Sequence, residues 1–123
     1  CKMKFFFTIL VCTLLIACER DSLSDISSST LDDGITLYDL PWQNSSASTN
    51  QQLSIQVGDT VRWTWDSGGH NLRSTSGVEN FNSGFIDANP GYQFQWIFTE
   101  LGSTQYVCDP HPSTMFGTIN VNE

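Results

Sequence analysis

Apolar and polar residues alternate with a period of two along much of the chain from residue 53 onward. Residues 53–57 (LSIQV) alternate, and after a Gly-Asp turn the run TVRWTW at residues 60–65 places one valine and two tryptophans on the same side. Residues 92–98 (YQFQWIF) repeat the pattern with an aromatic side chain at every second position. Because successive side chains of a strand point to opposite faces, this period predicts strands with one buried face.

Turn-forming residues separate these runs, and no segment has the period of an amphipathic helix. Gly, Asn, Pro and Ser gather at residues 66–69 (DSGG) and 87–91 (DANPG), and residues 34–52 predict a first strand followed by a long loop. About seven to eight short strands at this spacing are typical of an all-β, antiparallel sandwich or barrel. The large aromatic residues on the alternating faces are expected to form its core: Trp63, Trp65, Phe94, Trp96 and Phe98.

The beginning of the chain has a different pattern. A lysine precedes an apolar run at residues 5–16, which is too short to span a bilayer and has the charge-then-apolar order of a secretory signal. The run ends in LIAC, which resembles a bacterial lipobox, where the chain is cut before the cysteine and the thiol is lipidated. We therefore expect a signal peptide at residues 1–17, starting at Met3, and lipid on Cys18. A plain signal peptide and an uncleaved anchor are the alternatives.

The residues that follow Cys18 are rich in Ser and Asp and poor in large apolar groups. Such a segment cannot bury enough apolar surface to fold, so residues 18–33 are expected to form a flexible tether. The folded domain is then expected at residues 34–123.

Removing the signal changes the cysteine count. Four cysteines in an exported protein suggest two disulfides. Cys1 and Cys12 would leave with the signal and Cys18 would carry lipid, so Cys108 would be the one free thiol of the mature chain. A free thiol in an oxidising compartment is a liability unless something occupies it, and a metal is the obvious occupant.

The charge of the mature chain disfavours one class of partner. Both lysines lie in the signal, which leaves three arginines against thirteen acidic residues. Three arginines in such an acidic chain are too few to neutralise a run of phosphates, so nucleic acid is disfavoured as a partner. An acidic surface could steer a basic partner protein, although solubility or a saline habitat explains it equally well.

Candidate metal ligands cluster in the segment YVCDPHPSTMFGTINV at residues 106–121. Cys108, His111 and Met115 lie there between two apolar runs, and the only other histidine, His70, follows the strand at residues 60–65. Each alone is commonly structural, but two imidazoles, one thiolate and one thioether are the donors of a blue-copper site. Structural zinc gains little from a thioether, and calcium and magnesium prefer oxygen.

The segments VGDTVRWTW, GHN, FTELGSTQYVCDPH and MFGTINV follow one another in an order that resembles the cupredoxins of the plastocyanin, pseudoazurin and amicyanin type. The resemblance covers the chain from about residue 52 onward. It implies an eight-stranded Greek-key β-sandwich with one type 1 copper at one end. The implied ligands are His70, Cys108, His111 and Met115, and the implied role of Asn71 is to tie the two ligand loops together. The three residues between His111 and Met115 form a loop of intermediate length for this family.

These observations predict a monomeric electron carrier, not an enzyme, whose copper alternates between Cu(I) and Cu(II). Two histidines leave none for a second copper centre of the kind that oxidases and nitrite reductases need. The expected partners are redox proteins, namely a cytochrome, an oxidase or a reductase, with His111 as the point of electron entry and exit. The expected location is the envelope of a Gram-negative bacterium, lipid-anchored and facing the periplasm or the exterior. The alternative is a lipoprotein that sequesters or delivers copper, which the scarcity of Met and His disfavours.

Overall fold

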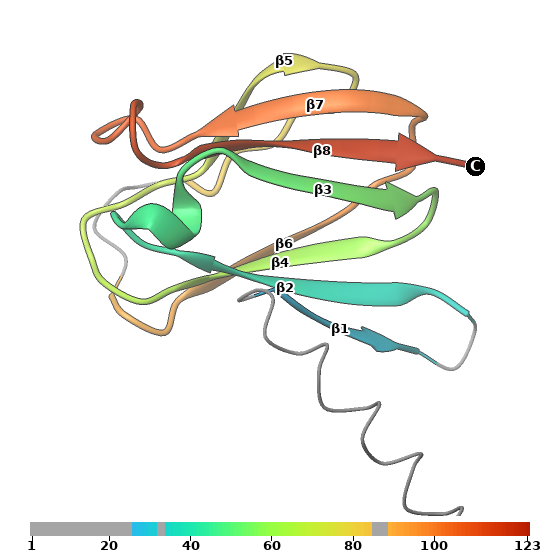
Figure 1. Cartoon of the computed structure of the whole chain (residues 1–123), viewed down its shortest axis with the longest axis horizontal. Coiled ribbons are helices and arrows are strands. Elements are labelled where there is room, and N and C mark those ends of the chain that lie inside the picture. Colours follow the sequence, from blue (N-terminus) through green and yellow to red (C-terminus); the bar gives the residue numbers. More distant parts are fainter. Residues whose placement is uncertain (1–25, 32–33, 85–88) are drawn as a thin grey trace, which may run out of the picture.

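Two four-stranded β-sheets pack face to face in the computed structural model, which describes residues 26–31, 34–84 and 89–123 (Figure 1). The expected all-β Greek-key sandwich is confirmed. A short 3₁₀ helix at Ser46–Ser48 lies between the second and third strands. The strands are β1 (Ser27–Thr30), β2 (Thr36–Trp42), β3 (Gln51–Gln56), β4 (Thr60–Trp65), β5 (Arg73–Gly77), β6 (Gln93–Ile97), β7 (Gly102–Val107) and β8 (Phe116–Asn122).

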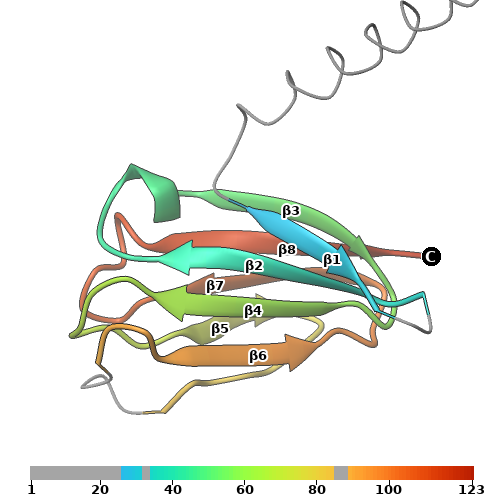
Figure 2. The same ribbon diagram turned by 90° about the horizontal axis from the view of Figure 1, so that it is seen from below.

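Both sheets are mixed, whereas the sequence pattern suggested antiparallel strands. One sheet has the order β1-β2-β4-β6 and the other the order β3-β8-β7-β5, which Figure 2 shows from below. The pairs β2·β4 and β3·β8 are parallel and the other pairs are antiparallel. The reason is that β3 crosses to the opposite sheet between β2 and β4, so the two strands it separates run in the same direction. Alternation of side chains predicts strands but not this crossing.

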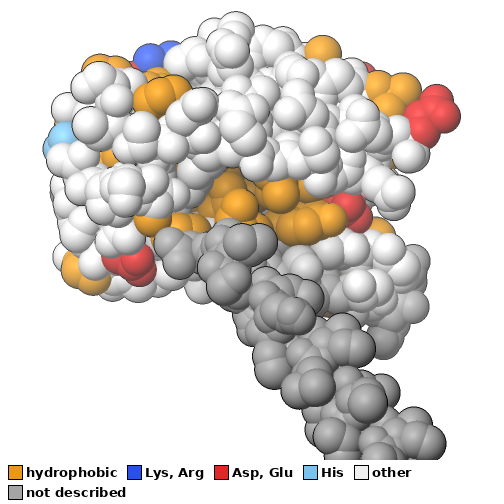
Figure 3. All heavy atoms as spheres, in the orientation of Figure 1, with side chains coloured by type: hydrophobic (Ala, Val, Ile, Leu, Met, Phe, Trp, Pro, Cys, Tyr) orange, Lys and Arg blue, Asp and Glu red, His pale blue; other side chains and the backbone are white. Residues whose placement is uncertain are grey.

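The core lies between the sheets and is built by the alternating faces. On β4, Val61, Trp63 and Trp65 are fully buried. Phe98 is also fully buried, while Phe94 and Trp96 are half-buried and pack against the core, so the predicted core residues all contribute to it. Figure 3 shows apolar side chains in the hollow between β3 and β2.

The turn between β3 and β4 fixes the end of the sandwich opposite to the β7–β8 loop (Figure 1). Gly58 adopts a φ of 98°, which an L side chain rarely tolerates. The buried carboxylate of Asp59 then accepts hydrogen bonds from the backbone N–H groups of Thr36 (2.9 Å) and Gln56 (2.9 Å). One side chain thereby joins the start of β2, the end of β3 and the start of β4.

Strand β1 lies in the stretch that the sequence predicts as a flexible tether. Ser27–Thr30 pair with residues 36–39 of β2, and their side chains are all exposed. Because the strand is held through its backbone and has no buried face, an apolar alternation could not reveal it. The ordered chain therefore begins before residue 34.

The predicted signal at residues 1–17 and the expected lipidation site Cys18 lie outside the described residues. Within the described ranges, no helix has the length and apolar character required to cross a membrane.

Candidate metal centre

Two loops at one end of the sandwich carry the predicted ligands. His70 lies in the loop between β4 and β5, and Cys108, His111 and Met115 lie in the loop between β7 and β8. Strands β4 and β7 end at the same side of the molecule, so residues far apart in sequence meet there (Figure 1). The structure brings His70, Cys108 and His111 together, with their donor atoms within 4.8 Å of one another.

The three donor atoms form a small triangle. Nδ1 of His70 lies 3.2 Å from Nδ1 of His111, and Sγ of Cys108 lies 3.8 Å and 3.7 Å from these two nitrogens. Nitrogen and sulfur donors about 2.0 and 2.3 Å from a common ion lie roughly 3 to 4 Å apart at wide angles. The triangle therefore has the right size for one metal ion, and its N₂S donor set fits copper.

Burial controls the ionisation of these groups. His70 and Cys108 are buried, and only His111 has a part-exposed side chain; a histidine is visible at the left rim of Figure 3. Burial lowers the pKa of His70, and the neighbouring His111 lowers it further, which favours the neutral ring that can bind a metal. Burial raises the pKa of the Cys108 thiol, against the opposing effect of the backbone N–H groups of Asn71 and His111. A metal would have to displace that proton.

The ring of His70 is oriented by its surroundings. Nδ1 faces the triangle, and Nε2 lies 2.9 Å from Ser67 Oγ. A metal bound to Nδ1 would leave the proton on Nε2, which would then donate to Ser67 Oγ. The indole N–H of Trp65 donates to the carbonyl of His70 (3.0 Å), and that of Trp42 donates to the carbonyl of Asn71 (2.9 Å). Trp42, Trp65 and Ser67 thus position the ligand, a role that the sequence did not reveal because aromatic alternation predicts only a core.

The loop that carries the other ligands is closed on itself. Cys108 N–H donates to the carbonyl of Met115 (2.9 Å), and the carbonyl of His111 accepts from the N–H groups of Thr114 (3.2 Å) and Met115 (2.9 Å). The three residues after His111 therefore form a single turn. Met115 is fully buried on this loop.

The β2–β3 connection supports the same loop from outside. Thr49 Oγ1 donates to the carbonyl of Thr114 at 2.8 Å, and the Thr114 hydroxyl donates to the Asn44 side chain. The sequence predicts this connection only as a long loop. Its contact with the ligand loop depends on the crossing of β3 to the other sheet, which a local pattern does not show.

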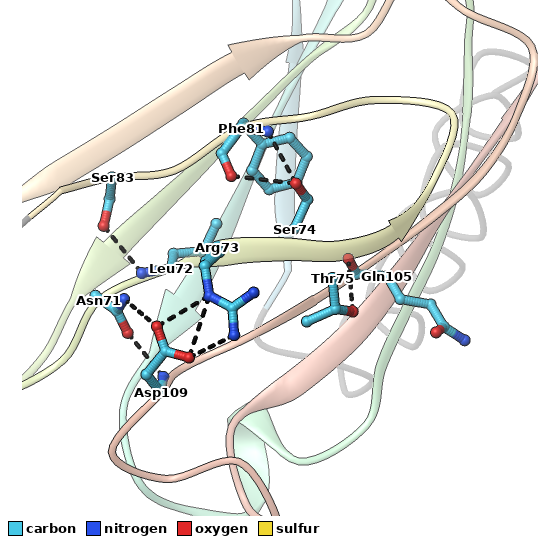
Figure 4. Close-up of polar contacts among 9 residues, drawn as sticks. All are labelled: Asn71, Leu72, Arg73, Ser74, Thr75, Phe81, Ser83, Gln105 and Asp109. Atoms are coloured by element: carbon cyan, nitrogen blue, oxygen red, sulfur yellow. Dashed lines mark hydrogen bonds and ion pairs between the residues drawn. The ribbon is translucent and has the colours of Figure 1, made fainter.

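Asn71 links the two ligand loops directly. Its side-chain Nδ2 donates to Asp109 Oδ2 (2.7 Å), and its Oδ1 accepts from the backbone N–H of Asp109 (2.8 Å). Arg73 also contacts the Asp109 carboxylate, as Figure 4 shows. Hydrogen bonds from Arg73 and Asn71 lower the pKa of Asp109 to about 2. Sequence reasoning identified Asn71 but not Arg73 or Asp109.

Comparisons with known proteins agree with this site. Residues 43–122 match the family model of copper binding proteins, plastocyanin/azurin family. Halocyanin of Natronomonas pharaonis is 32% identical over 110 residues, which cover 84% of this chain and 67% of that protein.

Solved structures show the same likeness. A purple cupredoxin from Nitrosopumilus maritimus has a TM-score of 0.52 and 29% identity, over 68% of this chain and 100% of that one. A mutant of amicyanin in its reduced Cu(I) form at pH 4 has a TM-score of 0.54 and 26% identity, over 78% of this chain and 92% of that one. Together with the family match and the convergent N₂S triangle, these likenesses make the chain a copper-binding member of the plastocyanin/azurin family, that is, a cupredoxin.

Proposed function

We propose that the protein is a single-copper electron carrier in which His70, Cys108, His111 and Met115 are the ligands. The observation that carries the proposal is the triangle of two imidazole nitrogens and one thiol sulfur, with edges of 3.2, 3.7 and 3.8 Å. When bound, copper supplies a one-electron couple between Cu(I) and Cu(II). The chain supplies donors of both hard and soft character, which suit both oxidation states.

The surroundings of the triangle support electron transfer without rearrangement. Two indole N–H groups hold the backbone next to His70, and the His111 carbonyl closes the turn that ends at Met115. Ligands held in this way keep their positions when the charge on a bound metal changes. Because His111 is the only histidine with a part-exposed side chain, we propose its ring as the place where electrons enter and leave.

The same features disfavour copper delivery and catalysis. Release of the metal would require the buried His70 and Cys108 to become accessible. Four protein ligands leave no open position for a substrate, so the proposal includes no enzymatic activity. The partners are then redox proteins such as a cytochrome, an oxidase or a reductase. The protein binds them as a monomer.

Anchoring at the cell envelope completes the proposal. It rests on the LIAC sequence at residues 15–18 and places a lipid on Cys18, with the domain facing the periplasm or the exterior of a Gram-negative cell. Mass spectrometry of the mature N-terminus tests it. A lipid-modified Cys18 is expected, and Cys18→Ser should move the protein to the soluble fraction. An unmodified N-terminus would contradict the anchor but leave the copper site untouched.

The electron-carrier proposal is tested by spectroscopy and voltammetry of the copper-loaded protein. We expect an intense visible thiolate-to-copper band that disappears on reduction, a reversible one-electron couple and very slow loss of copper to a chelator. Cys108→Ser should lack the band. Copper binding without the band, or fast copper loss with slow electron exchange, would refute the carrier and favour delivery.

A further inference from the structure

Asp109 stands between two proposed ligands, and its carboxylate is held on two sides. Nδ2 of Asn71 donates to Oδ2 at 2.7 Å. Nε of Arg73 lies 3.1 Å from both carboxylate oxygens, and Nη2 lies 2.6 Å from Oδ1 (Figure 4). The planar guanidinium therefore meets the planar carboxylate with two nitrogens, the arrangement that fixes direction as well as distance.

The backbone of Arg73 is itself fixed. Arg73 is the first residue of β5 and pairs with Val107, the last residue of β7, directly before Cys108. On its other side it forms a β-bridge with Asn82. The guanidinium is thus attached to the sheet at the point where the ligand loop leaves it.

The ion pair of Arg73 with Asp109 uses one of the few basic side chains in the described part of the chain. Among the described residues, Arg62 and Arg73 are the only arginines, and there is no lysine. Each pairs with one aspartate, Arg62 with Asp39 in the sheet and Arg73 with Asp109 beside Cys108. The side chains of Arg73 and Asp109 are 42% and 44% exposed. Ion pairs at that exposure contribute little to folding stability, so a stabilising role does not account for the placement of Arg73.

We propose that Arg73 is a positioning residue of the copper centre, which acts through Asp109. The inference rests on the copper site proposed above. Arg73 holds the Asp109 carboxylate, and with Asn71 it restrains the segment between Cys108 and His111. It also offsets the negative charge of Asp109, the residue that directly follows Cys108. Charge compensation affects the reduction potential, whereas restraint affects copper loss and amide exchange, so the two effects can be measured separately.

The charge effect predicts shifts of opposite sign. In Arg73→Gln, the uncompensated carboxylate favours the more positive oxidised copper, so the midpoint reduction potential falls. In Asp109→Asn the negative charge is removed, and the potential rises. Both shifts should shrink as salt is added, because the pair is part-exposed. The double variant Arg73→Gln with Asp109→Asn should return to a potential close to that of the wild type.

The restraint predicts faster copper loss and faster amide exchange. Arg73→Gln should lose copper to a chelator roughly tenfold faster, the lower end of the usual effect of removing a group that orients a metal ligand. The backbone N–H of Asp109 should exchange with solvent faster in the metal-free variant. Arg73→Lys keeps the charge but not the two-nitrogen contact, so it should keep the potential and still lose copper faster.

The matched control is Arg62→Gln, which also removes a guanidinium from an aspartate, but between β2 and β4. It should leave the potential, the copper loss and the exchange at Asp109 unchanged. The inference is overturned if Arg73→Gln behaves like the wild type, or if Arg73→Gln and Asp109→Asn shift the potential in the same direction. A wild-type protein without a reversible couple would instead refute the proposed function, and amide exchange at Asp109 in the metal-free protein would still decide the positioning role.

Discussion

Gly117 lies at a tightly packed point of the second sheet, two residues after Met115. A Cβ at this position would lie 2.5 Å from Oη of Tyr106 and 2.6 Å from the carbonyl oxygen of Gln51. Tyr106 is fully buried, and its hydroxyl donates to Oε1 of Gln51 at 2.6 Å. The glycine is therefore needed for space, and it allows β3, β7 and β8 to approach around one buried hydrogen bond.

Gly117→Ala is expected to lower the free energy of unfolding by about 2 kcal/mol, because overpacking costs typically 1–3 kcal/mol. Urea denaturation of the metal-free protein measures this, with the exposed Ser54→Ala of neighbouring β3 as the control, which should stay within about 0.5 kcal/mol of the wild type. An unchanged stability in Gly117→Ala would show that Tyr106 and β3 can move apart without cost.

At the level of the elements, a charged pair joins two parallel strands on the outer face of the first sheet. Asp39 of β2 lies opposite Arg62 of β4 in the strand register. Nε of Arg62 lies 3.1 Å from both carboxylate oxygens, and the hydroxyl of Thr64 donates to the same group. The hydrogen bond from Arg62 is the largest cause that lowers the pKa of Asp39, with a further contribution from the positive charge.

This pair predicts an acid-dependent part of the stability. Because the pKa of Asp39 is lower in the folded state than in the unfolded chain, its contribution is fully present above the unfolded value, about 3.9, and is lost as the pH falls through the folded value. Asp39→Asn should lower the free energy of unfolding at pH 7. At pH 3 the free energies of unfolding of the variant and the wild type should lie closer together. Denaturation of the metal-free proteins at both values tests this. If the free energies of unfolding of variant and wild type differ as much at pH 3 as at pH 7, the assigned role of the pair is contradicted.

At the scale of the whole molecule, the fold holds the two ligand loops in one place. Each loop joins strands of the sandwich that the core fixes, and Trp42, Trp63, Trp65 and Tyr106 are all fully buried between the sheets. A site held in this way exists in the folded chain and not in the unfolded one. Copper binding should therefore be coupled to folding.

Copper loading is expected to raise the thermal unfolding midpoint of the protein. At free copper about a thousandfold above its dissociation constant, the added stability is about 4 kcal/mol. Calorimetry of the loaded and metal-free protein measures it, and Cys108→Ser should lose most of the increment. Equal midpoints with and without copper would mean that the metal does not bind the folded site.

The sequence predicts the strands and one ligand loop because these depend on local patterns, whereas the Greek-key order and the ligand role of His70 came from the resemblance to cupredoxins. Alternation reveals β4, and the spacing of Cys108, His111 and Met115 reveals one ligand loop. The contact of Arg73 with Asp109 could not be predicted, because it depends on which strands are neighbours and on their register. Strand β1 was missed since it buries no side chain, and the contact of Thr49 with the ligand loop depends on the crossing of β3.

In the proposed site, one copper ion lies among Nδ1 of His70, Sγ of Cys108 and Nδ1 of His111. A crystal structure of the copper-loaded protein, with anomalous diffraction recorded at the copper absorption edge, tests this most directly. We expect a single copper peak inside the triangle, within bonding distance of all three atoms. A peak elsewhere on the molecule, or copper bound without the Cys108 sulfur, would contradict it.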